Sequence, residues 1–397
     1  LETWSAKDPL HNYEAFLLNK EILSEGKITY YSTKIKMELD NALEKVSEER
    51  TGDYDLNTEL NDVFTPFVHV EQEYIGPKSS RRLIDAIREA LDQSLEKHPN
   101  LVLMGQDIAE FGGVFKATEG LVEKYGKARV RNTPLCESAI VGTAVGLSIN
   151  GYKAMVEMQF ADFVSNGFNQ IVNNVAKLHY RTGLSADVVI RMPTGAGTGA
   201  GPFHSQSNEA WFTKVPGLKI IYPSGPYDAK GLLNEAFNDP NPILFFEHKV
   251  LYRSIQEEVP EGYYTLPFGK AKIYSEGTLA TVITYGMGVH WAMDYKKATG
   301  LDIEILDLVS LVPLDYETIK LSVTKTGKVL LLTEDTLTGS IISDIAAWIG
   351  EHIFNHLDAP VFRVGSLDTP VPFNKVLEEN FLPRKRFEER LAELLSY

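Results

Sequence analysis

The chain has 397 residues, of which 44% are hydrophobic and 23% are charged, and these globular values exclude a fibrous or fully disordered chain. The length predicts about two to three domains. Lys and Arg number 39 against 54 Asp and Glu, so the net charge is −15, and this excess of acid argues against general binding to nucleic acid.

The cysteine content and the hydropathy of the sequence exclude further classes of protein. Cys136 is the one cysteine of the sequence, so no intramolecular disulfide is possible, which suits a reducing compartment. Zinc sites with four cysteines, or with two cysteines and two histidines, are excluded for the same reason. The sequence has no run of about 18 apolar residues, so we expect no membrane span.

The first 50 residues predict helices without a core of their own. Asp8 and Pro9 are typical of a helix start, with Asp8 as the cap. The apolar residues that follow are spaced as on one helical face but are too few for a separate core. We therefore expect these helices (1–50) to pack on another chain or on another part of the same protein. Residues 51–78, which include Gly76 and Pro77, predict an extended linker.

A change of pattern near Ser79 predicts the first of two α/β domains, over residues 79–262. Ser79 or Ser80 is expected to cap a helix that carries Leu83 and Ile87. Short apolar strands then alternate with helices, which indicates a largely parallel sheet covered on both faces. The predicted strands are 101–104, 154–158, 188–191, 219–222 and 243–247, and the predicted helices are 138–150, 161–180 and 226–238.

A stretch with two prolines, a glycine and two tyrosines at 258–267 predicts a domain boundary, after which the alternation restarts. The second domain is expected over residues 263–397. Its predicted strands are 278–284, 302–306, 328–332 and 361–364, and its predicted helices are 288–298, 315–324 and 340–354. The predicted fold class is therefore α/β, with two doubly wound, mostly parallel-sheet domains after a helical N-terminal extension.

The first candidate for chemistry is Glu137, which follows the predicted strand 129–131 at a strand-to-helix junction with apolar neighbours. In open parallel sheets, ligands bind at the carboxyl ends of the strands. A carboxyl group in an apolar pocket tends to have a raised pKa and can exchange a proton. The alternative is an acid in the first turn of a helix that complements the helix dipole.

The second candidate is His204, at the end of a loop whose four glycines alternate with small residues. No Lys follows the glycines, and the loop does not open directly into a helix, so the pattern is not that of a phosphate-binding loop. The glycines are expected to give a flexible backbone that presents His204. Histidine titrates near neutral pH and suits proton transfer. The alternative is a structural histidine.

Three further segments have a functional and a structural interpretation. Gln159 and Phe163 follow a predicted strand and suit hydrogen bonding to, and stacking on, a flat heterocycle, although the phenylalanines of this segment are equally typical of a core. Residues 239–242 suit either an ordinary loop or a monovalent cation site. Residues 368–373 suit either the rim of a subunit interface or a simple turn.

Together and in this order, these motifs closely resemble the β subunits of the thiamine-diphosphate-dependent 2-oxo acid dehydrogenases, above all the branched-chain type. The resemblance spans residues 79–397. It is carried by residues 132–137, 157–163, 204–211, 216–219, 229–233, 246–252, 267–272 and 368–373. Residues 1–50 resemble the C-terminal tail of the α subunit of the same enzymes, through Trp4–Pro9 and an acidic helix, which implies an α–β fusion.

The resemblance implies a transketolase-like pyrimidine-binding domain followed by a transketolase C-terminal-like domain. Thiamine diphosphate would lie between an α-type and a β-type domain, with Mg²⁺ and the diphosphate held by an α-subunit Gly-Asp-Gly motif that this sequence lacks. Glu137 would bond the ring nitrogen of the aminopyrimidine and favour its imino tautomer, which removes the thiazolium C2 proton. Leu135, Gln159 and Phe163 would line the same pocket, and His204 would help to transfer the acyl group to a lipoyl group.

The resemblance also implies a potassium site. Its ligands would be the carbonyls of Ala186, Val188, Val189 and Ala236, together with Asp239 and Asn241. The sequence departs from some relatives here, because Ala186–Val189 replaces a Gly-Ser-Leu-Thr-like run. It departs again at Thr336–Ser340, where relatives often have adjacent glycines, and we expect this change to alter the interface with the acyltransferase core and not the chemistry.

The implied activity is oxidative decarboxylation of a branched-chain 2-oxo acid with acyl transfer to lipoyl. The implied partners are an α-type domain or subunit, a second αβ unit in a homodimer, and a lipoyl acyltransferase core, without nucleic acid or membrane. Alternatives are the β part of a pyruvate or acetoin dehydrogenase, and a non-catalytic assembly module, since the fragment alone is expected to be inactive. A transketolase-like sugar enzyme is disfavoured by the loop at His204. We expect a cytoplasmic protein in a bacterium or, failing that, a mitochondrial matrix protein.

Overall fold

The computed structural model describes residues 2–49 and 55–397, which fall into two units divided between Glu59 and Leu60. Residues 51–54 of the expected linker lie outside the described residues. No helix in the described part of the chain is both long and apolar enough to cross a membrane.

The N-terminal unit contains helices without a core. They are α1 (Glu2–Ser5), α2 (Pro9–Asn19) and α3 (Glu25–Glu48), and α4 (Leu56–Asn61) spans the division between the units. Asp8 caps α2 as predicted, since its Oδ1 accepts hydrogen bonds from the backbone N–H groups of Leu10 and His11 at 2.8 and 3.0 Å. None of the described residues of α1, α2 and α3 is buried, which confirms the expectation that these helices have no core of their own.

The stretch that follows α4 is bound to the main unit, although it forms neither helix nor strand. The backbone N–H of Thr65 donates to Asn241 Oδ1 at 2.8 Å, and the N–H of Gln72 donates to Thr265 Oγ1 at 3.2 Å. This part of the expected linker is therefore anchored along its length by its own backbone groups.

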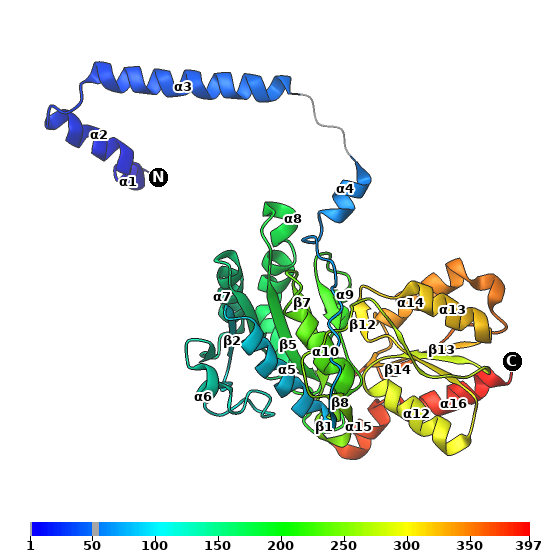
Figure 1. Ribbon diagram of the computed structural model, residues 1–397. Coiled ribbons are helices and arrows are strands. Elements are labelled where there is room, and N and C mark those ends of the chain that lie inside the picture. The colour runs from blue at the N-terminus through cyan, green and yellow to red at the C-terminus, as the bar shows by residue number, and fades with distance from the viewer. Residues whose placement is uncertain (1, 50–54) are drawn as a thin grey trace. The chain divides into compact units, whose positions relative to one another are not determined.

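A large sheet forms the first half of the main unit. Among the described residues its seven strands run in the order β12-β6-β7-β5-β4-β2-β3, and the pairs from β6 to β3 are parallel, as predicted (Figure 1). The strands in chain order are β2 (Leu101–Gly105), β3 (Val130–Asn132), β4 (Lys153–Glu157), β5 (Val188–Thr194), β6 (Lys219–Ile221), β7 (Ile243–His248) and β12 (Ser310–Val312).

Side chains alternate between the two faces of this sheet, as the two-residue repeat of a strand requires. Leu101 and Leu103 of β2 join a core with α5 and α10, whereas Val102 and Met104 join a core with α7. Figure 1 shows α5 and α10 side by side. The helices of this half are α5 (Leu83–Lys97), α6 (Leu121–Tyr125), α7 (Glu137–Ile149), α8 (Leu178–Thr182), α9 (Ala210–Thr213), α10 (Pro226–Ala236) and α11 (Leu251–Ser254).

Two local predictions for this half are wrong. Ser79 and Ser80 do not cap a helix but lie in strand β1 (Lys78–Arg82), which pairs antiparallel with β8 (Gln256–Pro260), and α5 starts only at Leu83. The predicted helix 161–180 is broken into a 3₁₀ turn at Ala161–Gly167, a wide π-type turn at Gln170–Val175 and α8. Gly167 lies against α7, and Asp162 is fixed by Gln206, so tertiary contacts override the helical pattern here.

The second sheet has the order β14-β13-β10-β11-β9, parallel except for β9. Cores on its two faces contain α12 and α16 on one side and α13 and α14 on the other (Figure 1). Its strands are β9 (Lys272–Ser275), β10 (Thr281–Thr284), β11 (Glu304–Asp307), β13 (Val329–Thr336) and β14 (Phe362–Ser366). Its helices are α12 (Met287–Thr299), α13 (Tyr316–Thr326), α14 (Ile341–His352), α15 (Lys375–Phe381) and α16 (Arg384–Leu395).

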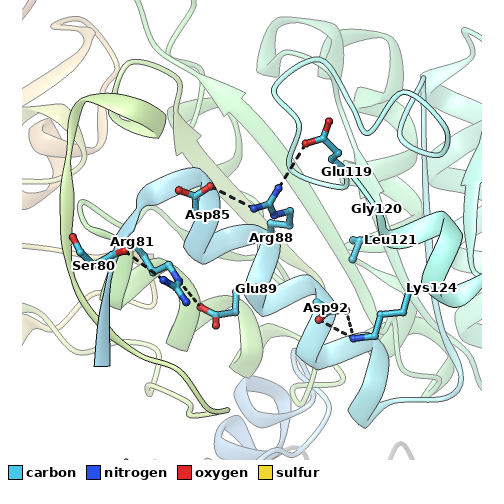
Figure 2. Close-up of a pocket in the computed structure, with 10 residues that line it drawn as sticks. All are labelled: Ser80, Arg81, Asp85, Arg88, Glu89, Asp92, Glu119, Gly120, Leu121 and Lys124. Atoms are coloured by element: carbon cyan, nitrogen blue, oxygen red, sulfur yellow. Dashed lines mark hydrogen bonds and ion pairs between the residues drawn. The ribbon is translucent and has the colours of Figure 1, made fainter. Parts of the chain in front are cut away.

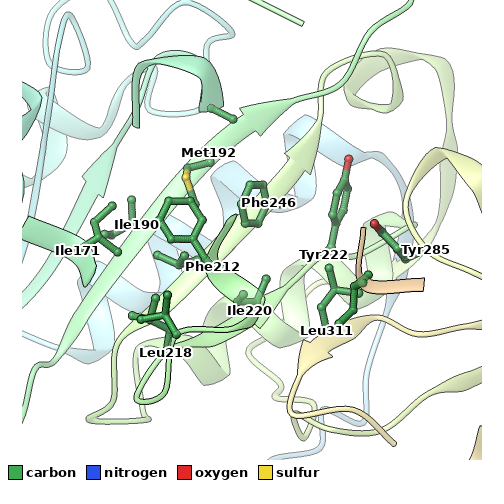
Figure 3. Close-up of a cluster of buried hydrophobic side chains, with 14 of the residues drawn as sticks. Ile171, Ile190, Met192, Phe212, Leu218, Ile220, Tyr222, Phe246, Tyr285 and Leu311 are labelled. Carbon is green, nitrogen blue, oxygen red and sulfur yellow. The ribbon is translucent and has the colours of Figure 1, made fainter. Parts of the chain in front are cut away.

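A shared core joins the two halves of the main unit. Strand β12 leaves the second half and pairs antiparallel with β6 of the first sheet. Figure 3 shows Leu311 of this strand together with Tyr222 and Tyr285, whose rings lie 5.2 Å apart between centroids. The fold class, two mostly parallel α/β layers with a helical N-terminal region, is therefore as predicted, and the two halves pack through one continuous apolar cluster.

Candidate functional site

The carboxyl ends of three parallel strands meet at one edge of the first sheet. The register pairs Gly105 at the end of β2 with Asn132 at the end of β3 and with Glu157 at the end of β4. The segments that follow these strands therefore begin next to one another. Ligands bind at such edges in open parallel sheets.

Glu137 lies at this edge as the first residue of α7, with only 9% of its surface exposed. Gln106, which directly follows β2, donates a hydrogen bond from Nε2 to Glu137 Oε1 at 3.1 Å. The other amide atom, Gln106 Oε1, is buried and has no hydrogen-bond partner among the described residues. The edge thus contains a carboxylate that is oriented by a hydrogen bond and, beside it, a buried amide oxygen that can still accept a hydrogen bond.

A hollow of about 1040 Å³ opens over Glu137. Phe163 lines it from the 3₁₀ turn after β4, and Leu135 lines it from the loop after β3 with 83% of its surface exposed. The lining residues are Leu135, Cys136, Glu137, Ser138, Ala139, Gly142, Thr143, Phe163, Asn166 and Gln170. The hollow therefore combines one buried acid, one aromatic ring and small residues of α7 that leave room for a flat group.

Gln159 holds the turn that contains Gln106. Its Nε2 lies 3.4 Å from the carbonyl oxygen of Gln106 and 3.2 Å from Asp107 Oδ2. Asp107 has a φ of 58°, in the left-handed region, so this turn is strained and needs such support. The structure thus places Gln159 behind Gln106 rather than against the hollow.

His204 packs beside Phe163, so the second candidate residue, His204, lies near the first, Glu137. The imidazole ring meets Phe160 at 4.7 Å and Phe163 at 5.5 Å between ring centroids, in both cases edge to face. Since Phe163 also lines the hollow with Glu137, the histidine lies one aromatic ring away from it. The structure therefore brings together Glu137, Phe163 and His204, which are far apart in the sequence.

The segment after His204 is tied to the segment that carries Phe163. Asp162 Oδ1 accepts hydrogen bonds from the backbone N–H and the Nε2 of Gln206 at 3.2 and 3.0 Å. At the start of the loop, Lys249 Nζ donates to the carbonyl oxygen of Gly195 at 2.5 Å. Burial lowers the pKa of Lys249 to about 8, so this ammonium group loses its proton within the range of mildly alkaline solutions.

Two of the residues expected to bind potassium, Asp239 and Asn241, are engaged by other groups. Asp239 forms an ion pair with Lys219 through one oxygen and accepts Asn241 Nδ2 at 2.7 Å through the other. Asn241 also binds the backbone of Thr65 through both polar side-chain atoms. The lysine ammonium already supplies the positive charge for Asp239. Across the described ranges, no group of three or more His, Cys, Asp or Glu residues is arranged to hold a metal ion.

A second hollow, of about 580 Å³, has a different character. Figure 2 shows it between α5 and the start of α6, lined by Arg81, Arg88 and Lys124 together with acids. Arg88 contacts Asp85 and Glu119, and Lys124 binds Asp92 at 2.7 Å. Positive and negative side chains thus neutralise one another there, and we assign no chemistry to this surface.

Gln106 is the residue that the sequence analysis missed. A polar side chain that directly follows the buried strand 101–105 is a usable signal, because the carboxyl end of every strand in a parallel sheet borders the ligand edge. The sequence alone does not show that this amide meets Glu137, because the contact depends on β2 and β3 being neighbours.

Comparison with known proteins assigns both halves of the main unit. Residues 80–255 match the family described as the transketolase pyrimidine binding domain, and residues 269–386 match the transketolase C-terminal domain. A solved structure, a split-gene transketolase in the form of an inactive β4 tetramer, superposes with a TM-score of 0.63 and covers 81% of this chain and 99% of that chain. Its sequence identity is 21%, so this likeness shows the fold alone.

Several curated proteins are more similar in sequence. The 2-oxoisovalerate dehydrogenase subunit beta of Bacillus subtilis is 46% identical over 79% of this chain and 98% of its own length. A mitochondrial 2-oxoisovalerate dehydrogenase subunit beta of Arabidopsis thaliana is 44% identical over 77% of this chain and 86% of its own. The pyruvate dehydrogenase E1 component subunit beta of Porphyra purpurea is 43% identical over 75% of this chain and 91% of its own.

Proposed function

The chain belongs to the β-subunit family of the 2-oxo acid dehydrogenases, and from this we propose that it is the β part of a decarboxylating component that acts on branched-chain 2-oxo acids. The observation that carries the proposal is the hollow over Glu137, where an acid and an aromatic ring meet at the ligand edge of the sheet. In this proposal the hollow takes the aminopyrimidine ring of thiamine diphosphate.

The residues of the hollow fit that ring. Glu137 would offer its carboxylate to a ring nitrogen. Gln106, bound to Glu137 from behind the lining, has a buried Oε1 without a partner among the described residues, which would suit an exocyclic amino group. Phe163 offers a face for packing against a flat heterocycle. When bound, the cofactor supplies an electron sink for cleavage of the bond between the carboxyl group and the 2-oxo carbon.

Glu137 has the central role in this proposal. It is the first residue of α7 and is buried at the sheet edge, where its carboxylate lines the hollow. A carboxyl group held next to the ring nitrogen could share a proton with it. Gln106 fixes the orientation of Glu137 by its hydrogen bond, and Gln159 in turn supports the backbone of Gln106.

His204 is proposed to act in the second half of the reaction. Its half-buried imidazole lies beside Phe163 at the end of a loop, where it can reach a substrate that enters from solvent. We assign it proton delivery, or stabilisation of developing negative charge, during transfer of the acyl group to a lipoyl group.

The open shape of the hollow supports the proposal that a partner completes it. Leu135, at its rim, is an apolar side chain with 83% of its surface exposed. We propose that an α-type domain covers this rim and holds Mg²⁺ and the diphosphate, that two αβ units form a homodimer, and that the assembly serves a lipoyl acyltransferase core. On this view the isolated chain is inactive.

The N-terminal unit is proposed to belong to the α side. Its exposed apolar residues, among them Leu39 and Leu43 of α3, form faces that need a partner. We propose that residues 1–50 are an α-subunit tail in an α–β fusion, followed by a linker at 51–78, a pyrimidine-binding domain at 79–262 and a C-terminal domain at 263–397. The compartment proposed is the bacterial cytoplasm, or else the mitochondrial matrix.

The proposed function does not depend on potassium. The site at Ala186, Val188, Val189, Ala236, Asp239 and Asn241 stays a prediction, and the bonds of Asp239 to Lys219 and Asn241 argue against it. The backbone just before β5 is also engaged, since the carbonyl of Ala186 accepts the N–H of Val188 at 2.8 Å. No step of the reaction is assigned to this ion.

Substrate choice is tested on the complex of this chain with its α partner and thiamine diphosphate. We expect decarboxylation of 3-methyl-2-oxobutanoate to exceed that of pyruvate. A preference for pyruvate by about tenfold or more in kcat/KM would reject the branched-chain assignment in favour of the pyruvate alternative, which the 43% identity to a pyruvate dehydrogenase subunit keeps open.

The non-catalytic alternative has its own test. An assembly module would bind no thiamine diphosphate with or without the α partner. We expect calorimetry to show binding by the complex and none by this chain alone. Tight binding by the chain alone would contradict the proposal that this chain contains only half of the cofactor site.

A further inference from the structure

We infer that Glu378 is a positioning residue for His204, which it holds in place through the glycine-rich loop 195–204. The inference rests on the role proposed above for His204. Glu378 belongs to α15, in the second half of the main unit, whereas the loop follows β5 in the first half. An acid of one half would thus control where a reactive group of the other half lies.

The loop has a backbone shape that gathers N–H groups. Its four glycines have φ values of 94°, 92°, 70° and 70°, in the left-handed region that favours glycine, and they alternate with Ala196, Thr198 and Ala200. Successive N–H groups that converge in this way form a concavity for an anion.

Glu378 provides the anion. Its Oε1 accepts the N–H of Gly197 at 2.8 Å, and its Oε2 accepts the N–H of Gly199 at 2.9 Å. The side chain is 97% buried, since 3% of the residue is exposed. In the part of the chain that the structure describes, no Lys, Arg or His forms an ion pair with it. The loop N–H groups are therefore its direct hydrogen-bond partners, and release of the loop would leave two buried acceptor oxygens without donors.

Further contacts from the second half hold the same loop. Glu334 Oε1 accepts the N–H of Ala196 at 2.6 Å, and Glu334 also binds His248 Nε2 at 2.7 Å. Phe373 packs so closely on Gly201 that an added Cβ would lie 2.2 Å from the ring. Each contact fixes a different point of the loop ahead of His204.

His204 lies between these anchors and the fixed segment that follows it. On the far side, Gln206 is bound to Asp162, next to Phe163. Because the chain is held on both sides of His204, a shift of the Glu378 anchor moves the imidazole relative to Phe163 and the hollow. Small misplacements of a group that reacts are costly to a rate while they leave binding intact.

The test uses Glu378→Gln in the complex with the α partner. The amide of glutamine offers one acceptor, and its NH₂ group faces an N–H donor, so one of the two loop bonds is lost while the shape is kept. We expect acylation of a lipoyl domain to fall by about tenfold in kcat, while decarboxylation coupled to an artificial dye oxidant stays within about twofold. Glu379→Gln is the matched control, because Glu379 is an exposed neighbour on the same helix, and it should change neither rate.

A double-mutant cycle separates positioning from mere support of the fold. In a His204→Ala background, Glu378→Gln should have no further effect on lipoyl acylation, because its target is gone. An equal loss of both rates together with a lowered unfolding temperature would overturn the inference, as would unchanged lipoyl acylation.

Hydrogen exchange of the loop amides gives a readout that needs no activity. We expect residues 195–204 to exchange faster in Glu378→Gln than in Glu379→Gln. Unchanged exchange would overturn the anchoring itself. If the wild-type complex decarboxylates no 2-oxo acid, the proposed function fails, and the exchange result still decides whether Glu378 anchors the loop.

Discussion

Gln106 and Glu137 are joined by a hydrogen bond of 3.1 Å across two strands that are neighbours in space and 31 residues apart in sequence. The amide follows β2 and the acid begins α7 after β3. Glu137 lines the hollow, whereas Gln106 is buried beside it and does not itself line the hollow. The pair therefore links the topology of the sheet directly to the proposed cofactor site.

Loss of this amide should weaken cofactor binding. Gln106→Ala removes the donor that orients Glu137, and a hydrogen bond to a charged group is worth about 1.5–3 kcal/mol, so we expect thiamine diphosphate to bind the αβ complex about tenfold more weakly. Calorimetry measures this change. Gln256→Ala, at an exposed glutamine of β8, is the control. Equal affinity of both variants would show that Gln106 does not support the site.

The start of the glycine-rich loop should not tolerate a side chain. In Gly195→Ala the new Cβ would lie 2.2 Å from His248 Nε2, and His248 is buried and bound to Glu334. Gly199→Ala is the control, because its φ is also left-handed while its nearest neighbour lies 3.9 Å away. We expect Gly195→Ala to lower the free energy of unfolding by about 1–3 kcal/mol more than Gly199→Ala. Equal losses in chemical denaturation would contradict the clash.

Replacement of the buried arginine at the centre of the first sheet should lower the free energy of unfolding. Arg191 is fully buried and binds Glu157 at 2.6 Å and Glu247 at 2.6 and 2.7 Å. Arg191→Met leaves two buried acids without their partner, so we expect a loss of about 3–5 kcal/mol in the free energy of unfolding. Arg384→Met breaks an exposed pair with Asp294 and should cost less than about 1 kcal/mol. Similar losses for the two variants would refute the buried network.

Stability should fall as the pH rises, because of buried acids between the two halves. Burial, and then the nearby charge of Glu209, raises the pKa of Asp335 to about 8 from 3.8, and burial raises the pKa of Glu209 to about 7 from 4.5. A pKa raised on folding means that the folded state binds more protons, so the contribution is complete below the unfolded pKa and is lost as the pH rises through the folded pKa.

This loss of stability should take place between about pH 4 and about pH 8. Asp335→Asn should therefore flatten the fall in unfolding temperature across the upper part of this window. Asp294→Asn, at an exposed acid, should leave the fall as in the wild type. If Asp335→Asn kept the full slope, the acid would not titrate as its surroundings require.

The sequence was a good guide wherever a short pattern decides the structure. Apolar runs predicted β4, β5, β6 and β7 to within a few residues, and Asp8 predicted the start of α2. Glu137 was placed at a strand-to-helix junction because the strand and the helix adjoin in the chain. Each of these features depends on contacts within one element or between adjacent elements.

Features that depend on distant partners were not predictable. Strand β1 forms where a helix cap was expected, because β8 pairs with it across more than half of the main unit. The 3₁₀ and π-type turns of 161–175 depend on contacts with α7 and Gln206. The anchoring of the His204 loop by Glu378 likewise joins residues 181 positions apart. Spacing in the sequence contains no information on such pairs.

Glu137 is proposed to act directly on the cofactor ring. The most direct measurement is decarboxylation of 3-methyl-2-oxobutanoate by the complex of this chain with its α partner, with wild-type Glu137 and with Glu137→Gln. We expect the variant to assemble and unfold as the wild type does but to lose activity by about a hundredfold or more, because glutamine cannot share a proton with the ring nitrogen. A folded Glu137→Gln complex with full activity would contradict it.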